Sequence, residues 1–194
     1  MADGVEIPLF PLATVLFPGG PLPLRIFEAR YIDLVGRCMR EGSGFGVVLI
    51  VEGTEAGGPA TIRDVGTYAR IVDFSHQPDG LLGIRAVGER RFRILGSRCE
   101  RDGLNVALVE WLPEERVVAL PDEFAELGPL LESALGELAE LYLGMERHPQ
   151  DAAWVSARLA EVLPLPMRHK QHCLELDDPV ERIRYLRPLF EIAR

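Results

Sequence analysis

The sequence predicts an α+β protein, in which a β-rich N-terminal unit closes into a barrel or sandwich and a small helical bundle follows it. Three observations predict this order. Short runs of β-branched and aromatic residues, broken by Gly and Pro, fill the first part of the chain. Apolar residues then recur at helical spacing beyond Pro121, and a clear helix-start signal stands at Asp178. We therefore expect two domains, residues 1–117 and residues 118–194.

Three stretches of the first domain have the composition of strands. Residues 45–51 (FGVVLIV) form a nearly unbroken apolar run after a Gly-Ser-Gly turn, which is typical of a strand buried on both faces. Residues 91–94 and residues 105–111 alternate polar with apolar side chains, which predicts strands with one face in water.

A hairpin and a helix complete the first domain. Residues 68–74 and residues 81–87 flank the sequence Pro78-Asp79-Gly80, which predicts a β-hairpin because Pro fixes one backbone dihedral and Gly accepts a positive one. Residues 28–39 break the strand pattern, since their apolar side chains recur at helical spacing. The apolar positions of this predicted helix are Tyr31, Leu34, Val35 and Cys38.

The second domain is expected to hold four helices. A long amphipathic helix is predicted from Phe124 to Tyr142, followed by helices over residues 151–163 and residues 168–176. The last helix begins at Asp178 as N-cap, with Glu181 placed to complete a capping box. Its apolar face is Ile183, Leu186, Leu189 and Phe190.

Composition places the chain among ordinary globular proteins. Hydrophobic residues make up 47% and charged residues 26% of the sequence, which argues against a disordered or fibrous chain. The widely spaced Cys38, Cys99 and Cys173 indicate free thiols in a reducing compartment. No basic leader and no apolar run of ~20 residues is present, so we expect no membrane segment and a cytoplasmic location.

Nucleotide and metal sites are not expected. The glycines from Gly53 to Gly58 have the outer spacing of a P-loop, but Pro59-Ala60 stand where the essential Lys and Ser or Thr belong. His169, His172 and Cys173 would share one helix face and could in principle share a zinc ion. We interpret Cys173 as a core residue instead, and we predict no cofactor and no metal.

Nucleophilic catalysis is not indicated either. The sequence has no Gly-x-Ser-x-Gly elbow, and its serines and threonines lie in predicted turns or on helix faces. A pair formed by Ser156 and Lys170, the single lysine, stays open as an alternative at this level. We expect the protein not to be an enzyme.

A cluster of arginines offers a competing function. The net charge of −9 repels polyanions, yet Arg91 and Arg93 fall on one side of a predicted strand, with Arg85 and Arg98 nearby. Together they could bind acidic peptides or RNA. The favoured interpretation is a solvated strand face, because Phe92 is the only aromatic residue among them and faces the other side. A nucleic-acid partner is therefore not expected.

Several motifs have a specific order and spacing. They begin in residues 7–12 (IPLFPL), 15–19 (VLFPG) and 22–31 (LPLRIFEARY), continue through 88–94 (GERRFRI) and reach 176–183 (LDDPVERI). In these motifs the sequence resembles the Lon protease N-terminal, substrate-binding domain family in its free-standing bacterial form. This resemblance implies a six-stranded PUA-like β-barrel carrying one helix, followed by a helical bundle. In Lon this domain helps to select polypeptide substrates and to assemble the oligomer, and a related domain occurs in cereblon, a ubiquitin-ligase substrate receptor.

The resemblance implies a polypeptide-binding module. The sequence ends at Arg194 with no ATPase motif and no peptidase domain, so we expect binding of a client or partner protein without catalysis. A homo-oligomer is compatible with the family. Substrate-binding candidates are Phe10, Phe17, Phe27, Arg30 and Tyr31, which lie in the matching N-terminal motifs.

Overall fold

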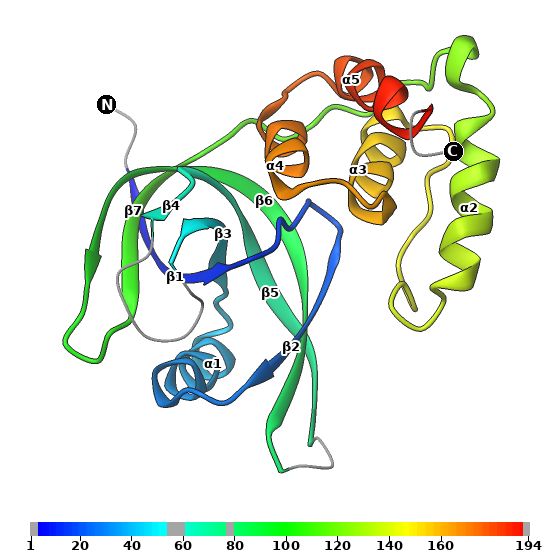
Figure 1. Cartoon of the computed structure of the whole chain (residues 1–194). Helices are drawn as coiled ribbons and strands as arrows, with labels where there is room; N and C mark the ends of the chain where they lie inside the picture. The colour runs from blue at the N-terminus through cyan, green and yellow to red at the C-terminus, as the bar shows by residue number, and fades with distance from the viewer. Residues whose placement is uncertain (1–3, 54–60, 77–79, 192–194) are drawn as a thin grey trace. The chain divides into compact units, whose positions relative to one another are not determined.

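The computed structural model describes residues 4–53, 61–76 and 80–191, which belong to two compact units (Figure 1). The first, Met1–Pro113, is called the strand unit, because it holds all seven strands of the described residues and one helix. The second, Glu114–Arg194, is called the helical unit and holds the other four α-helices. The chain is therefore a mixed α/β protein with five α-helices in its described part.

The strand unit contains one more strand than the six that the family resemblance implied. Its elements are β1 (Val5–Leu12), β2 (Pro21–Ile26), α1 (Ala29–Glu41), β3 (Phe45–Glu52), β4 (Thr61–Ile62), β5 (Val65–His76), β6 (Leu82–Cys99) and β7 (Asn105–Trp111). The additional strand is β4, which has two residues and pairs with the end of β3. A segment this short carries no periodicity from which it could be recognised.

The hydrogen-bonded path of the sheet returns to its first strand. The order is β1-β7-β6-β5-β3-β4, and β1 also pairs with β3, in parallel. The other pairs are antiparallel, including the predicted hairpin of β5 and β6. In the turn of that hairpin Gly80 has the positive φ of 82°, whereas Pro78 and Asp79 lie outside the described residues.

Strand β6 is continuous over 18 residues and unites two stretches that the sequence suggested separately. Gly88 lies between them, where a Cβ atom would come within 2.3 Å of the Phe17 carbonyl oxygen. Its backbone exchanges hydrogen bonds with Gly19 and Gly20, so the preceding loop lies directly on the strand. Only glycine permits this close approach.

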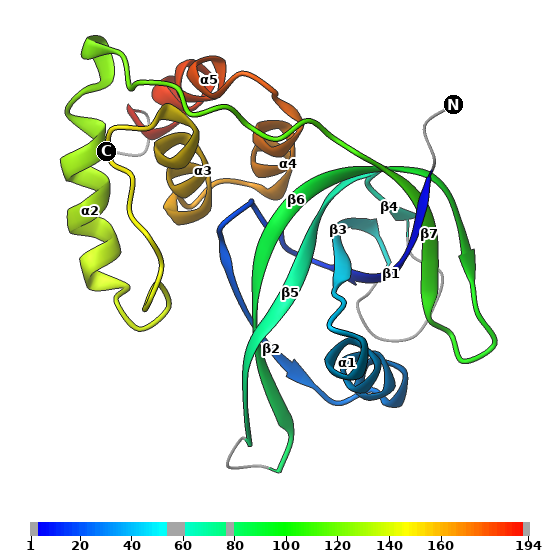
Figure 2. The same ribbon diagram turned by 180° about the vertical axis from the view of Figure 1, so that it is seen from behind.

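The two halves of β6 have different neighbours. The half from Phe92 to Cys99 pairs with β7, whereas residues 82–87 have β5 on one side and β2 on the other (Figure 2). These three strands form a ribbon, called the β2-β6-β5 ribbon. Its inner side joins the larger apolar core through Ile84 and Ala86.

Helix α1 confirms the prediction from apolar spacing. Its buried residues are Tyr31, Leu34, Val35 and Cys38. The helix ends at Gly42, whose φ of 63° gives the left-handed C-cap that glycine adopts without strain.

The long helix predicted from Phe124 to Tyr142 is wrong as a single element. The structure has a 3-10 turn, η1 (Asp122–Phe124), then α2 (Leu127–Glu137), and the following residues are turns. Pro129 explains the break, because inside a longer helix its ring would meet the carbonyl of Ala125, four residues earlier. The apolar spacing still identified buried positions, namely Phe124, Leu127, Leu131, Leu135 and Tyr142.

The remaining helices begin within one residue of their predicted starts. They are α3 (Ala152–Val162), α4 (Met167–Glu175) and α5 (Pro179–Glu191). The Asp178 carboxylate accepts the Val180 N–H at 2.8 Å, as expected of an N-cap. Glu181 does not complete a capping box, since it pairs with Arg184 at 2.8 Å. None of the helices in the described ranges is long and apolar enough to cross a bilayer.

Candidate functional site

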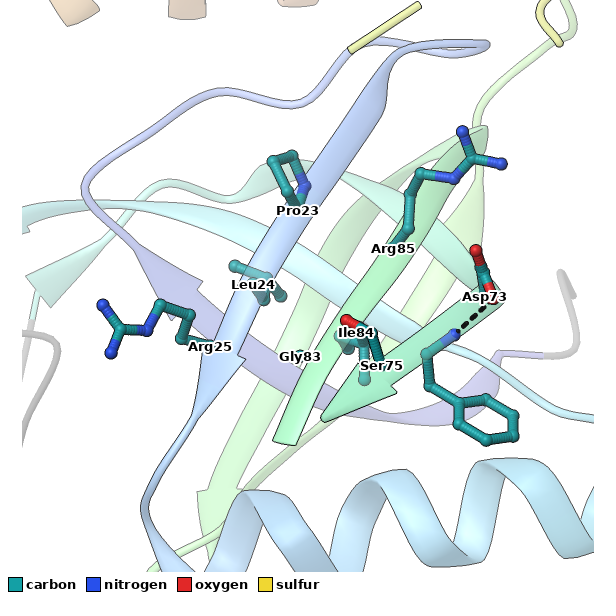
Figure 3. Close-up of a pocket in the computed structure, with 9 residues that line it drawn as sticks. Pro23, Leu24, Arg25, Asp73, Ser75, Gly83, Ile84 and Arg85 are labelled. Carbon is teal, nitrogen blue, oxygen red and sulfur yellow. Dashed lines mark hydrogen bonds between the residues drawn. The ribbon is translucent and has the colours of Figure 1, made fainter. Parts of the chain in front are cut away.

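A shallow depression of about 540 Å³ lies over the β2-β6-β5 ribbon (Figure 3). Nine residues line it, three from each strand. The strand register arranges them in three cross-strand rows: Pro23, Arg85 and Asp73; Leu24, Ile84 and Phe74; Arg25, Gly83 and Ser75.

The alternation of side chains along a strand explains the shape of this depression. Paired residues share a face of the sheet and consecutive residues take opposite faces. The middle row belongs to the inner face, where Ile84 is buried and Leu24 packs against the core. The two outer rows project from the other face, and Gly83 leaves a space between Arg25 and Ser75 because it has no side chain. The floor is therefore backbone.

The walls of the depression carry charge of both signs. Arg25 is exposed and Arg85 half-buried, and they extend in different directions from neighbouring strands (Figure 3). Asp73 lies in β5, and its carboxylate accepts a hydrogen bond from the backbone N–H of the next residue, Phe74, at 2.8 Å. Guanidinium groups donate to carboxylates and carbonyl oxygens, so the surface can hold polar chain atoms as well as acidic side chains.

Two exposed aromatic side chains belong to the same strands or follow them directly. Phe74 in β5 is 60% exposed, and Phe27, the residue after β2, is 61% exposed. Val72, also in β5, is 51% exposed. Large apolar side chains in contact with water are suited to anchor a partner.

Of the five substrate-binding candidates, the structure leaves only Phe27 well exposed. Phe10, Phe17 and Tyr31 lie in the core, at 6%, 0% and 4% exposure. The rings of Phe10 and Tyr31 stack in parallel with centroids 3.9 Å apart, which fixes α1 against β1. The motif that carries the family resemblance is thus largely a packing motif.

Arg30 holds α1 in place. Its guanidinium donates to the Gly103 carbonyl at 2.7 Å and pairs with Glu28 at 2.9 Å. It also lies 4.6 Å from the ring centre of Tyr31. These contacts tie the helix to the turn that connects β6 and β7.

The arginines of the anion-binding alternative do not share one surface. Arg85 lines the depression, whereas Arg91 is 3% exposed. Arg93 pairs with Glu110 at 3.5 Å, and Arg98 pairs with Glu6. Arg85 pairs with β2 and β5, whereas Arg93 and Arg98 lie in the half of β6 that pairs with β7, so these arginines belong to different parts of the sheet.

The candidate zinc ligands have other partners. The His169 Nδ1 atom lies 2.6 Å from the Tyr185 hydroxyl, and the His172 ring packs against the same tyrosine. Cys173 is fully buried, and burial raises the pKa of its thiol to about 11. Among the described residues, no three His, Cys, Asp or Glu side chains are grouped to hold a metal ion.

Ser156 and Lys170 are likewise engaged elsewhere. The Ser156 hydroxyl donates to the Ala153 carbonyl and accepts from Arg182, each at 3.1 Å. The Lys170 ammonium donates to the Glu161 carbonyl at 2.8 Å, and burial lowers its pKa. The structure therefore gives this serine no lysine base.

Most residues of the depression were not singled out from the sequence. Arg85 was considered for anions, but Pro23, Arg25, Asp73, Ser75 and Gly83 were not. The available signal was Gly83, because a glycine within a strand pattern marks a bulge or a place where another backbone approaches closely.

Comparisons with known proteins agree with this fold. The family model described as the ATP-dependent protease La (LON) substrate-binding domain matches residues 6–190. Protein cereblon of Danio rerio is 32% identical over 130 residues, which cover 64% of this chain and 29% of that protein. Lon protease of Haemophilus influenzae is 27% identical over 95% of this chain and 24% of its own length. The chain thus spans less than a third of these curated relatives.

Solved structures extend the similarity to three dimensions. The Lon N-terminal domain protein from Xanthomonas campestris is 40% identical, with a TM-score of 0.78 over 94% of this chain and 96% of that one. The N-terminal domain of Mycobacterium avium complex Lon protease shares the fold, with a TM-score of 0.63, 19% identity and the same coverage of both chains. The match over residues 6–190 shows that this chain belongs to the LON substrate-binding domain family.

Proposed function

We propose that the protein binds polypeptide segments on the outer face of the β2-β6-β5 ribbon and performs no chemical step on them. Membership of a substrate-binding domain family supports the class of function. The observation that carries the proposal is the depression itself, in which the Gly83 floor lies beside Arg25 and two residues from Arg85 in the same strand.

An extended polypeptide fits the chemistry of this surface. Its carbonyl oxygens and acidic side chains accept hydrogen bonds from Arg25 and Arg85. Its apolar side chains, which alternate with the polar ones, can pack on Phe27, which directly follows β2. The surface is open and shallow, so binding is tolerant of sequence and weak, with a Kd on the order of micromolar.

The proposal includes a finer description of the scaffold. We take the closed hydrogen-bonded path of the strand unit as a PUA-like β-barrel and the helices of the helical unit as a small bundle. The proposed domains, residues 1–117 and 118–194, divide four residues after the boundary between the compact units. The partner is a client or partner polypeptide in the cytoplasm. Binding of RNA by the arginines is the alternative that the test must distinguish.

The test measures fluorescence anisotropy of a labelled, permanently unfolded polypeptide, reduced and carboxyamidomethylated α-lactalbumin, on addition of the full chain. Gly83→Val fills the floor and Arg25→Glu removes a donor, so each should weaken binding at least ~5-fold. Gly96→Val is the matched control, because Gly96 lies in the same strand with open space around its missing side chain.

Two results would refute the proposal. One is unchanged affinity in Gly83→Val and Arg25→Glu proteins that remain folded by circular dichroism. The other is the absence of polypeptide binding together with tight binding of a single-stranded RNA 20-mer that weakens steeply with salt, which would favour the anion-binding alternative.

A further inference from the structure

Helix α2 presents an apolar side chain to water next to its buried face. Leu127, Leu131 and Leu135 are buried, while Leu130 is 51% exposed. Two more exposed leucines follow the helix: Leu138, at 40%, and Leu143, at 69%. Within the helical unit, α3 lies beside α2 in both views (Figures 1 and 2).

Helical geometry places Leu130 in an acidic setting. Glu126 precedes it by four residues, and Ala134 and Glu137 follow it by four and seven, so these positions share one side of the helix. Glu126, Leu130, Ala134, Glu137 and the exposed Leu138 are together called the α2 flank. It combines an apolar strip with carboxylates at both ends.

The charge around this flank is of one sign. Residues 122–146 contain seven acidic residues and no basic residue. Glu123 pairs with Arg184 at 3.4 Å, and Glu146 lies 3.5 Å from His148. Within the described residues, no ion pair involves the other five acids, which are Asp122, Glu126, Glu132, Glu137 and Glu140.

These features define what can cover the flank. The leucines require apolar side chains, and the unpaired carboxylates require cations at the edges of the contact. A second copy of the same face would oppose acids to acids, because a two-fold interface brings a patch onto itself. Nucleic acid and anionic lipid are repelled by the same charge.

We propose that the α2 flank is a docking surface for a basic amphipathic helix of another protein. The partner helix carries leucine-like side chains on one face and Lys or Arg beside them. The contact is small, so the complex is transient and its affinity falls with ionic strength. This surface is separate from the polypeptide site on the β2-β6-β5 ribbon and does not depend on it.

The test uses the full chain and a fluorescein-labelled synthetic peptide, LKKLLKLLKKLLKL, with a second peptide that has Glu in place of each Lys. The lysine peptide should bind with a Kd of roughly 10–100 μM at low salt. Leu130→Ser with Leu138→Ser, and separately Glu126→Lys with Glu137→Lys, should each weaken it at least ~5-fold.

The matched control is Glu41→Lys with Glu52→Lys, which gives the same net charge through exposed acids of the strand unit. It should change the affinity less than ~2-fold, and only the Glu126→Lys, Glu137→Lys protein should bind the glutamate peptide. If the control variant weakened binding equally, net charge alone would explain the affinity for the lysine peptide, and the proposal would be overturned. A concentration-dependent dimer that Leu130→Ser abolishes would assign the flank to self-association and overturn it too.

Discussion

The strand unit and the helical unit bury different kinds of side chain. Among the described residues of the strand unit, the buried polar or charged residues are Thr67 and Arg91. The helical unit buries four in a shorter stretch of chain: Ser156, Arg158, Gln171 and Arg182. One unit therefore depends almost wholly on apolar packing, whereas the other has a charged network inside it.

The reason lies in where backbone hydrogen bonds are made. In the strand unit the ladders satisfy the backbone groups and the core can be apolar. Helices of 9–13 residues leave a large share of their carbonyls at the ends. Arg182 donates to two of these near the end of α4, those of Cys173 and Leu176, each at 2.8 Å. It also forms a bidentate ion pair with Glu115.

Breaking this pair should have the largest effect on stability. Arg182→Met removes the guanidinium that pairs with the mostly buried Glu115 carboxylate and that donates to two carbonyl oxygens, at a cost of about 4 kcal/mol in the helical unit. Urea unfolding followed by Trp154 fluorescence, in a Trp111→Phe background, reports on that unit alone.

Two further variants sharpen this prediction. Arg184→Met removes exposed ion pairs and should leave the unfolding midpoint nearly unchanged. Glu115→Leu combined with Arg182→Met should recover much of the loss, because an apolar pair does not leave a charge buried. If Arg182→Met and Arg184→Met unfolded at the same urea concentration, the network would not stabilise the unit.

A core truncation in the strand unit should cost somewhat less and for another reason. Leu9→Ala removes a fully buried side chain from the smaller core cluster, at about 3 kcal/mol for lost burial and the cavity left behind. Trp111 packs against that cluster, so its fluorescence in a Trp154→Phe background follows the transition. The loss should be the same at pH 6 and pH 8, since no charge is involved. A strong pH dependence would contradict apolar packing as its source.

The sequence allowed the local elements to be predicted and left the assembled surface unpredicted. Helix α1 and the N-cap Asp178 depend on residues within a few positions of one another, so spacing and capping rules found them. Phe124 and Tyr142 were correctly placed on a buried stripe, but Pro129 and the turns after Glu137 divide the helix that was expected to carry them.

The candidate site could not be predicted from the sequence, because its residues come together only through the pairing register of strands that are far apart in the chain. Pro23, Arg85 and Asp73 become neighbours only when β2 and β5 pair with opposite edges of β6. A shift of one residue in either pairing would turn Arg25 or Asp73 to the core side, and composition does not specify that choice. The buried Arg182 was missed for a similar reason, because its partner Glu115 lies 67 residues earlier in the chain.

Alkaline pH should weaken the helical unit by a smaller amount. Burial raises the pKa of Cys173 to about 11 from an ordinary 9, so the folded state keeps a proton that the unfolded state releases. The contribution of the protonated thiol to the free energy of unfolding is fully present below pH 9 and is lost as pH rises towards 11. Stability should fall by about 1 kcal/mol from pH 8 to pH 10 through this group. In urea unfolding, the Cys173→Ala variant should lack this loss of stability between pH 8 and pH 10. The same pH dependence in the variant would show that the Cys173 thiol is not its source.

The smallest effect is expected from an exposed ion pair of the strand unit. Arg98 hydrogen-bonds Glu6 and lowers the pKa of that carboxyl, so the pair's contribution is present above the ordinary pKa of Glu6 and lost as pH falls. Both side chains are more than half exposed. Arg98→Ala should therefore shift the Trp111-monitored midpoint far less than Leu9→Ala, and high salt should remove the difference. A shift as large as that of Leu9→Ala would mean that exposed charge, not apolar packing, holds this unit together.

The most direct test of the central claim is a nuclear magnetic resonance titration of the isotope-labelled full chain with carboxyamidomethylated α-lactalbumin. Binding on the β2-β6-β5 ribbon should shift the backbone amides of Arg25, Ser75, Gly83 and Arg85 first and in proportion to one another. The amides of α3 and α5 should stay in place. Saturable shifts confined to the helical unit, with the amide of Gly83 unmoved, would contradict the account.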